Sequence, residues 1–419
     1  MKIVVVGAGV SGLYAAWHLN RTHEVILLEA DARLGGHADT HLIGEGDRSL
    51  AIDSGFIVFN ERHYPLFSAW LQALGVPWQD SDMSFAVSDP VSGIEYNATS
   101  VDRLFCQRRN LVRPRFLKMV ADMVSFYRGA SDLLAEIDDQ LTLGQWLERY
   151  PPGSAFAELH LLPMASALWS APMQQVREFP MRHLLAFMNN HGMLTLGERP
   201  TWRTVCGGSR SYVERAAQGI ARIETGVRVD MIRRHPDRVE IASDHGVFHA
   251  DAVVLACHSD QALALLADPE PAERSILGAI GYQANEAVLH TDSRALPVHR
   301  RARASWNVRR DRRDLEQCRV SYYMNQLQRL DARKDYIVSL NQTELLDPAS
   351  ILVQRNYQHP VFTPAAVAAQ QRWSEINGVR RTWYCGAWWG WGFHEDGARS
   401  ARRVVDAIAD ADAPAAKAA

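Results

Sequence analysis

The sequence predicts an α/β protein in which a Rossmann-like domain, assembled from separate parts of the chain, is combined with a mixed-sheet and helical second domain. Residues 3–6 form an apolar run that breaks into a Gly-x-Gly-x-x-Gly turn before a helix-length stretch. A second apolar run then ends on an acid, Glu29. From about residue 64 to 197 the pattern is helical, and short strands then return. Strand, glycine turn, helix and terminal acid are together the parts of a dinucleotide-binding βαβ unit.

The glycines of the first turn have distinct expected roles. Gly7 permits the tight turn, Gly9 lets the backbone approach a pyrophosphate, and Gly12 lets helix and strand pack closely. Ser11 lies in the same turn, and the helix N-terminus there would supply N–H groups to the phosphates. Glu29 is placed to accept hydrogen bonds from ribose hydroxyls. The alternative is a glycine-rich strand–helix turn that holds no ligand.

The next segment, Ala30 to Thr40, favours FAD over NAD. It contains the pair Gly35 and Gly36, with a basic residue before it and His37 after it. Paired glycines let the chain pass close under an extended cofactor. We therefore expect Ala30, both glycines and His37 to contact FAD, and the alternative is an ordinary loop with two glycines.

Composition narrows the class of protein. A chain of 419 residues suggests two to three domains, and a net charge of −3 gives no reason to expect nucleic-acid binding. The five cysteines are scattered without metal-ligand spacing, so we expect reduced thiols and no metal site. The short apolar start is expected to be a first strand rather than a signal peptide. We expect a cytoplasmic protein that is at most peripheral to the inner face of the membrane.

The elements suggest two discontinuous domains. We expect an FAD-binding domain made of residues 1–62, 198–260 and 381–410. A substrate domain would comprise residues 63–197 and 261–380, and residues 411–419 would form a flexible tail. Strands are expected at about 24–29, 52–59, 226–232, 238–241, 246–248, 252–257, 286–291, 319–324 and 336–341. The strand at 252–257 ends on small residues, including Ala256, where a cofactor edge would pass. A last helix is expected from about 395 to 409.

Four further segments carry a family resemblance: 53–60, 80–85, 207–213 and 384–397. Together they resemble amine-oxidase-like flavoproteins, and specifically a bacterial branch related to the flavoprotein domain of plant cyclopropane fatty acid synthases. Bacterial relatives of this branch are associated with modified membrane fatty acids, including a flavin-dependent desaturase step towards furan fatty acids. The resemblance extends from residue 1 to about 409. It implies a fold of the amine oxidase/glutathione reductase-2 type.

The resemblance also implies which residues hold a non-covalent FAD. Beyond those named above, the implied cofactor-binding residues are Asp53, Ser54, Gly55, Phe56, Val229, Ala256, Gly386, Gly392, Phe393, His394 and Glu395. The helix after the glycines of residues 390–397 would direct its positive end at the flavin. The alternative there is a helix start with aromatic packing. Many members of the family have Arg where this chain has His37.

The expected catalytic residues are Glu286, His394 and Trp389. Amine oxidases commonly place a Lys beside flavin N5, and Glu286 stands at about that position, which disfavours amine oxidation. Glu286 would be a general base, and His394 would relay a proton. The alternatives are a strand acid that faces solvent or an Arg, and a helix start that packs. Further candidates for the walls of the substrate site are Trp388, Trp391, Tyr322, Tyr323, Asn325 and His359.

The segment from Arg103 to Lys118 interleaves Arg and Lys with Phe and Leu. Such a segment suits contact with anionic lipid headgroups, and the alternative is a solvated helix face or loop.

The resemblance leads us to expect hydride removal from a fatty acyl chain, free or in phospholipid, by desaturation or redox-neutral double-bond isomerisation. One alternative is oxidation of an amine or of a polycyclic substrate such as a carotenoid or porphyrinogen. Another is a non-catalytic, FAD-bound partner of a lipid methyltransferase.

Overall fold

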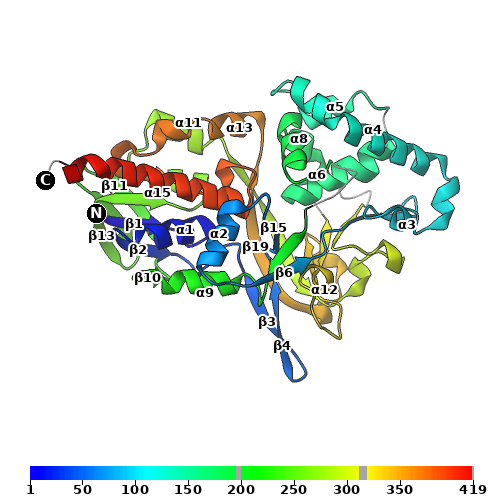
Figure 1. The fold of residues 1–419 in the computed structure, drawn as a ribbon, viewed down its shortest axis with the longest axis horizontal. Helices are drawn as coiled ribbons and strands as arrows, with labels where there is room; N and C mark the ends of the chain where they lie inside the picture. Colours follow the sequence, from blue (N-terminus) through cyan, green and yellow to red (C-terminus); the bar gives the residue numbers. More distant parts are fainter. Residues whose placement is uncertain (152, 195–199, 311–318, 418–419) are drawn as a thin grey trace.

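The computed structural model describes residues 1–151, 153–194, 200–310 and 319–417. Its first lobe is built on a five-stranded parallel sheet, and Figure 1 shows this lobe around the N-terminal strands and the long C-terminal helix. The strands, in spatial order, are β10 (Arg222–Thr225), β2 (Glu24–Glu29), β1 (Lys2–Val6), β14 (Ala252–Leu255) and β20 (Thr382–Tyr384). The three central strands are almost wholly apolar because both faces of the sheet are buried.

Successive side chains on β1 enter two different cores. Ile3 and Val5 pack with helices on one face, and Val4 and Val6 pack with a small sheet and helices on the other. The first face contacts α1 (Val10–Leu19), α2 (Pro65–Ala73), α9 (Arg210–Gln218) and α15 (His394–Lys417). The second face contacts the antiparallel strands β11 (Val229–Arg234), β12 (Val239–Ser243) and β13 (Gly246–Ala250), with α10 (Ser259–Leu265), α11 (Pro271–Leu277), α13 (Pro364–Gln370) and α14 (Trp373–Ile376). The predicted α/β class is confirmed.

The second lobe contains a seven-stranded mixed sheet covered by helices (Figure 1). Its strands, in spatial order, are β19 (Ile351–Val361), β15 (Gly281–His290), β18 (Ile337–Leu340), β17 (Val320–Tyr323), β16 (Trp306–Arg309), β7 (Phe85–Asp89) and β8 (Ile94–Asn97). The helices that share its core are α4 (Pro114–Glu136), α5 (Leu143–Leu147), α6 (Leu162–Trp169), α7 (Met173–Val176) and α8 (Met181–Asn190), with α12 (Met324–Leu327) beside the sheet and α3 (Val101–Leu104) after β8.

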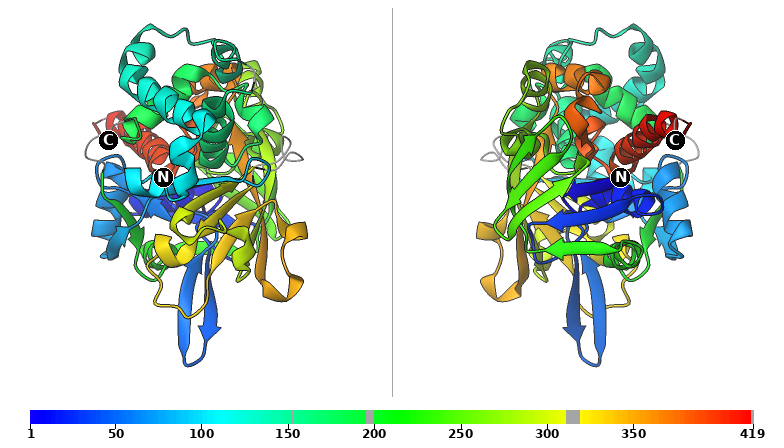
Figure 2. Two further views of the ribbon diagram at one scale, coloured as in Figure 1. Left: turned by 90° about the vertical axis from the view of Figure 1, so that its right-hand side faces the viewer. Right: turned by 90° about the vertical axis from the view of Figure 1, so that its left-hand side faces the viewer.

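Short elements join the lobes. A three-stranded sheet of β5 (Val58–Phe59), β9 (Trp202–Val205) and β6 (Trp78–Ser81) lies between them. The hairpin β3 (Thr40–Glu45) and β4 (Arg48–Asp53) projects from the body of the molecule, as the two side views in Figure 2 show.

Three sequence expectations differ from the observed elements. The segment expected to be helical contains the strands β6, β7 and β8. The last helix continues to Lys417, so most of the expected tail extends α15, and residues 418–419 lie outside the described residues. Helices α11, α13 and α14 come from the segment assigned to the substrate domain but pack on the parallel sheet. Among the described residues, no helix is both long and apolar enough to cross a bilayer.

Candidate functional site

A glycine turn between β1 and α1 forms the first wall of the site. Gly7 has φ +99°, and a Cβ on Gly12 would stand 1.8 Å from the Gly7 carbonyl oxygen, so neither position accepts a side chain. A Cβ on Gly9, by contrast, would meet nothing within 4 Å. Gly9 is also the N-cap of α1, and no side chain caps this helix, whose second residue is the buried Ser11. The first N–H groups of α1 therefore remain for a ligand, as phosphate binding requires.

A second loop, residues 33–37, lies directly over this turn. The Gly35 N–H donates to the Ala8 carbonyl at 2.9 Å, and a Cβ on Gly36 would lie 3.2 Å from the Gly9 Cα. The Arg33 guanidinium donates to the Gly36 carbonyl at 2.7 Å, so a side chain of the loop itself stabilises its conformation.

Glu29 ends β2 beside the glycine turn, as its predicted ribose role requires. Its carboxylate accepts from the Ala8 N–H at 2.7 Å and from the Asp31 N–H at 2.9 Å. Ala30 follows it at an exposed position, and Val229, which was expected beside the adenine, is buried in the core of the same lobe.

A third loop, residues 53–56, backs onto the second. A Cβ on Gly55 would stand 2.0 Å from the His37 carbonyl oxygen, and the Phe56 N–H donates to that oxygen at 2.8 Å. Asp53 is buried and accepts from the Ser209 N–H at 2.9 Å, so its side chain holds the loop from within the protein. Ser54 bonds the Tyr357 hydroxyl at 2.8 Å.

The N-terminus of α15 completes the cradle beside the N-terminus of α1. A Cβ on Gly397 would lie 2.7 Å from Val10 Cγ1, so the two helix starts are in contact. Ala256 lies beside these helix starts, because a Cβ on Gly12 would be 3.1 Å from the Cβ of Ala256. The Gly386 N–H donates to the Ser400 hydroxyl at 2.9 Å, which fixes the turn that leads into α15. Three glycine loops and two helix starts thus lie together, an arrangement that is typical of a dinucleotide site.

A cavity of about 180 Å³ opens where these loops end. Gly55, Phe56, Gly392 and Phe393 belong to both the cradle and the cavity wall. Most of the remaining wall comes from apolar and aromatic side chains of the second lobe: Ile57, Val58, Met83, Leu168, Trp169, Phe187, Met193, Trp202, Trp306, Leu340 and Trp391. The polar groups of the wall include His37, His359, His394, Tyr322 and Tyr357. The described wall contains no Asp, Glu, Lys or Arg.

The histidines of the wall are neutral. Burial lowers the pKa of His394 to about 3 and, with His258 nearby, that of His359 to about 4. Burial, together with His359 and His258, lowers the pKa of His37 well below its ordinary range. The cavity is therefore an uncharged environment at neutral pH.

His394 and Glu395, which were predicted to face the flavin, have their side chains engaged with the protein. The His394 imidazole stacks on Phe56 with ring centroids 3.3 Å apart, and its Nε2 bonds the Tyr212 hydroxyl at 2.7 Å. The Glu395 carboxylate accepts from the N–H groups of Leu66, at 3.2 Å, and Phe67, at 3.0 Å, and so caps α2. Their backbone still forms the start of α15 at the cradle.

Two residues predicted to be catalytic lie outside the cavity wall. Glu286 alternates with Asn285 along β15, and Asn285, which bonds His359 at 2.9 Å, shares a face of the sheet with the wall residues Tyr357 and His359. The Glu286 carboxylate instead accepts from the Thr343 hydroxyl on the opposite face. Trp389 packs against Trp388 in the core of the first lobe and donates to the Tyr384 carbonyl. Glu286 lies one residue away from the position on β15 that bonds His359, and Trp389 is buried in the core beside the parallel sheet.

Asn285 fixes the protonation of His359 through a chain of hydrogen bonds. The Glu286 N–H donates to Asn341 Oδ1 at 2.9 Å, and a backbone N–H acts only as a donor. Asn341 Nδ2 therefore donates to Asn285 Oδ1 at 2.7 Å, and Asn285 Nδ2 donates to His359 Nδ1 at 2.9 Å. A neutral His359 must then carry its proton on Nε2, which leaves an N–H donor of fixed polarity on a residue of the cavity wall.

Sequence reasoning identified some wall residues and missed others. Tyr322, His359 and Trp391 do line the cavity, whereas Tyr323 donates to Asp335 and Asn325 bonds Tyr336 and Lys334 elsewhere. The missed wall residues include Tyr357, Trp169, Trp202 and Trp306, and Asn285, which bonds the wall residue His359, was also missed. The alternation of Tyr357 and His359 on β19, opposite Asn285 and Gln283, is the signal that would have located this wall.

Comparison with known proteins agrees with the geometry. Residues 10–340 match the family of flavin containing amine oxidoreductases. A flavin-dependent L-tryptophan oxidase from Lentzea aerocolonigenes is 44% identical over 63 residues, which is 15% of this chain and 13% of that protein. Across the curated relatives that it matches, this chain spans at most 59% of the relative's length.

Solved structures share the fold over nearly the whole chain. Cyclohexylamine oxidase from Brevibacterium oxydans IH-35A has a TM-score of 0.71 at 15% identity, with 98% of each chain covered. A CLA-producing fatty acid isomerase from P. acnes has a TM-score of 0.67 at 14% identity, with 96% of this chain and 97% of that chain covered. At these identities the likeness establishes the fold.

Proposed function

This chain belongs to the flavin containing amine oxidoreductase family and binds FAD, and from that premise we propose that it removes hydride from a lipid-like substrate. The proposed substrate is a fatty acyl chain, free or in phospholipid. The product would carry a new double bond or, in a redox-neutral reaction, a displaced one. When bound, FAD supplies the hydride acceptor at its N5 atom. Formation of a new double bond also releases one proton from the neighbouring carbon to solvent, and an external two-electron acceptor then reoxidises the flavin; isomerisation returns the hydride to the chain and needs no such acceptor.

The observation that carries this proposal is the uncharged wall of the cavity. Its apolar side chains would hold an alkyl chain by burial, and its neutral histidines offer no counter-ion to an ammonium group. Binding of a protonated amine there would leave a buried, unpaired charge, which is costly. The wall therefore suits the alkyl part of an acyl chain, and it offers an ammonium group aromatic faces but no counter-ion.

We propose that the residues of the cavity wall position the substrate and exclude water from it, and that they contribute no charge. Trp391 and Trp169 close the cavity on the side of the second lobe, where the Trp169 indole donates to the Trp391 carbonyl at 3.0 Å. Exclusion of water protects a hydride transfer from side reactions. His359, with its Nε2–H fixed by Asn285, would act as a positioning residue that donates a hydrogen bond to an oxygen of the bound molecules.

A polycyclic substrate is the second candidate. Four indoles, those of Trp169, Trp202, Trp306 and Trp391, line one cavity, and flat aromatic walls also suit a planar ring system. This candidate and the acyl chain share the uncharged wall but differ in shape.

Incubation of the FAD-loaded protein with total membrane lipid, followed by mass spectrometry of the acyl chains, tests the proposal. Desaturation predicts acyl products that have lost two hydrogen atoms, and isomerisation predicts products of unchanged mass with a displaced double bond. The matched control is the same protein with Trp391→Glu, which places a charge in the cavity wall. Acyl chains that are unchanged in mass and in double-bond position would contradict the proposal, and turnover of a porphyrinogen in parallel would favour the second candidate.

A further inference from the structure

A second surface of the molecule, far from the glycine cradle in sequence, combines exposed apolar and cationic side chains. We call it the basic–apolar surface and define it by the β7–β8 turn (90–93), α3, the 3-10 turn η1 (Arg108–Val112), the start of α4 (114–118) and residues 298–301. These parts form one neighbourhood. Arg109 donates to the Gly93 carbonyl at 2.6 Å, and Asp102 pairs with both Arg108 and Arg301.

Apolar side chains protrude from this surface. Of the eleven large hydrophobic residues that are exposed in the described chain, six lie here: Val91, Val101, Leu111, Val112, Leu117 and Val298. Val298 is 89% exposed and Val112 is 80% exposed. Single exposed apolar residues are normal on a protein surface, but a cluster of this kind marks a contact site.

The same surface is strongly cationic, although the whole protein carries a net charge of −3. Residues 101–118 contain five Arg and one Lys but a single acid, Asp102. Asp102 is shared between Arg108 and Arg301. Arg115 pairs with Glu158 and Lys118 pairs with Asp122, so these three acids neutralise part of the charge. Arg103, Arg109 and Arg300 have no carboxylate partner among the described residues. A surplus of positive charge therefore surrounds the protruding apolar groups.

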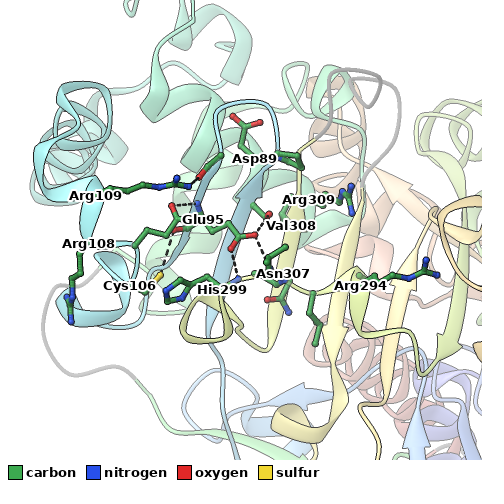
Figure 3. A pocket seen from close by; sticks show the side chains of 18 residues that line it. Asp89, Glu95, Cys106, Arg108, Arg109, Arg294, His299, Asn307, Val308 and Arg309 are labelled. Atoms are coloured by element: carbon green, nitrogen blue, oxygen red, sulfur yellow. Dashed lines mark hydrogen bonds between the residues drawn. The ribbon is translucent and has the colours of Figure 1, made fainter.

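A groove of about 840 Å³ runs through the surface. Figure 3 shows Arg108 and Arg109 on the helical side of the groove and Arg294 and Arg309 on the opposite side. Arg108 pairs with Asp102, and Arg294 pairs with Asp292. Glu95, which lies between them, is buried and accepts from the N–H groups of Val298, at 3.0 Å, and His299, at 2.8 Å. Its charge is thus engaged by the protein's own backbone, and arginines remain on both walls.

We propose that the basic–apolar surface docks on an anionic phospholipid bilayer, with the apolar side chains in the acyl boundary and the arginines on the phosphate groups. Charge complementarity identifies this occupant. A cationic rim around inserted Val and Leu matches the layered chemistry of a membrane surface, where headgroup charge and apolar depth occur together. The groove would receive headgroups between its two arginine walls. The proposal concerns where the protein binds and does not depend on the reaction proposed above.

Co-sedimentation of the full-length, FAD-loaded protein with vesicles tests this docking. We expect the protein to pellet with phosphatidylglycerol vesicles but not with phosphatidylcholine vesicles, and to be released as salt screens the arginines. Arg103→Gln and Arg109→Gln should each weaken binding by about fivefold, the effect of one interfacial charge. Val112→Asp combined with Val298→Asp should abolish it. Vesicle binding is read without turnover, so its failure is distinguishable from failure of the proposed reaction.

Matched controls lie on the other lobe. Arg238→Gln changes an exposed arginine just before β12, and Val247→Asp changes an exposed valine of β13; the two side chains are 49% and 57% exposed, and both variants should leave vesicle binding unchanged. Equal binding to both vesicle types, or equal losses from the control variants, would overturn the proposal. Complete release by inorganic phosphate at matched ionic strength would also overturn it, because the groove would then be a free-anion site.

Discussion

Gly9 and Gly12 lie three residues apart in the same turn, yet the space around them differs sharply. A Cβ on Gly12 would overlap the Gly7 carbonyl, whereas a Cβ on Gly9 would enter open space beside the start of α1. Gly12 is thus required by the packing of the chain itself, whereas Gly9 leaves room for a ligand over the helix N-terminus. Sequence spacing predicted the same division, with Gly9 expected to approach a pyrophosphate and Gly12 expected to let helix and strand pack closely.

This contrast predicts different outcomes for two alanine variants. Gly9→Ala should leave the stability of the FAD-free protein within about 1 kcal/mol of wild type and weaken FAD binding by about tenfold or more. Gly12→Ala should destabilise the FAD-free protein itself by several kcal/mol, on the order expected for overpacking. Urea unfolding of the FAD-free protein and FAD titration separate the effects. Equal FAD affinity in wild type and Gly9→Ala would place the pyrophosphate elsewhere.

Asn285 and Glu286 give a second residue-scale prediction. Asn285→Asp replaces the donor to His359 Nδ1 by a carboxylate, which should raise the pKa of His359 from about 4 towards or above its ordinary value and move its proton to Nδ1. Turnover should fall by about tenfold or more because a positioning contact is lost. Nitrogen NMR of the imidazole reports the tautomer directly.

The neighbouring control is Glu286→Gln, which preserves size and lies on the opposite face of the sheet. It should leave both the imidazole signals and turnover near wild type. A turnover loss in Glu286→Gln alone would restore Glu286 as the catalytic acid or base and contradict the register described above.

At the scale of elements, the start of α15 holds α2 in place. The Glu395 carboxylate accepts two N–H groups of the first turn of α2, a position that has no cap from its own chain segment. Sequence reasoning assigned Glu395 to the flavin because it stands beside the glycines of the last segment. Its actual partner is 328 residues away in the chain, and no local pattern reports such a contact.

Glu395→Ala should therefore lower the free energy of unfolding by about 1–2 kcal/mol, as loss of a helix cap does. The FAD content of the purified protein should change little. Glu375→Ala, which removes an exposed partner of Arg372, is the matched control and should leave the free energy of unfolding nearly unchanged. Loss of FAD at unchanged stability would instead indicate that the Glu395 side chain contacts the cofactor.

Elements were predictable where burial imposes a pattern. The strands β1, β2 and β14 are buried on both faces and appear in the sequence as unbroken apolar runs. The strands β7 and β8 were missed because they complete a sheet whose other strands lie more than 180 residues further along the chain. The sheet face on which Glu286 lies was mispredicted for a related reason. Alternation in the sequence shows that a strand has two faces but does not show which face is turned towards the cavity.

At the scale of the whole molecule, buried histidines link stability to pH. Burial lowers the pKa of His183, His191, His290 and His359 to about 4 from an ordinary value of 6.5. As pH falls below about 6.5, the unfolded chain takes up protons that the folded protein refuses, so stability is lost between about 6.5 and 4. Asp53 and Asp396, with pKa values raised to about 6 by burial, act in the opposite sense.

The histidines outnumber the two aspartates, so the free energy of unfolding should fall by several kcal/mol across this window. Urea unfolding of the FAD-loaded protein at stepped pH measures it. His183→Phe should flatten the curve, because His183 is buried by apolar and aromatic neighbours and has no acidic partner to lose. Stability that is constant or rising as the pH falls through the window would contradict the burial of these groups in neutral form.

The two-lobed arrangement places the cofactor cradle in one lobe and most of the cavity wall in the other. The cradle could be predicted because glycine spacing is local, whereas the wall could not because its indoles come from α6, β9, β16 and the turn before α15. Substrate chemistry thus depends on residues that meet only in the folded chain.

Anaerobic reduction of the bound flavin tests the account most directly. The FAD-loaded protein is mixed with an unsaturated acyl phospholipid, with the corresponding free acid and with an alkylamine of the same chain length, and the visible flavin band is followed. For the desaturation form of the reaction, an acyl substrate should bleach the band and the alkylamine should not, because the cavity wall is neutral and apolar. The account would be contradicted if the alkylamine bleached the band while the acyl substrates bound without effect. In that outcome the acyl substrates would neither bleach the band nor change their double bonds.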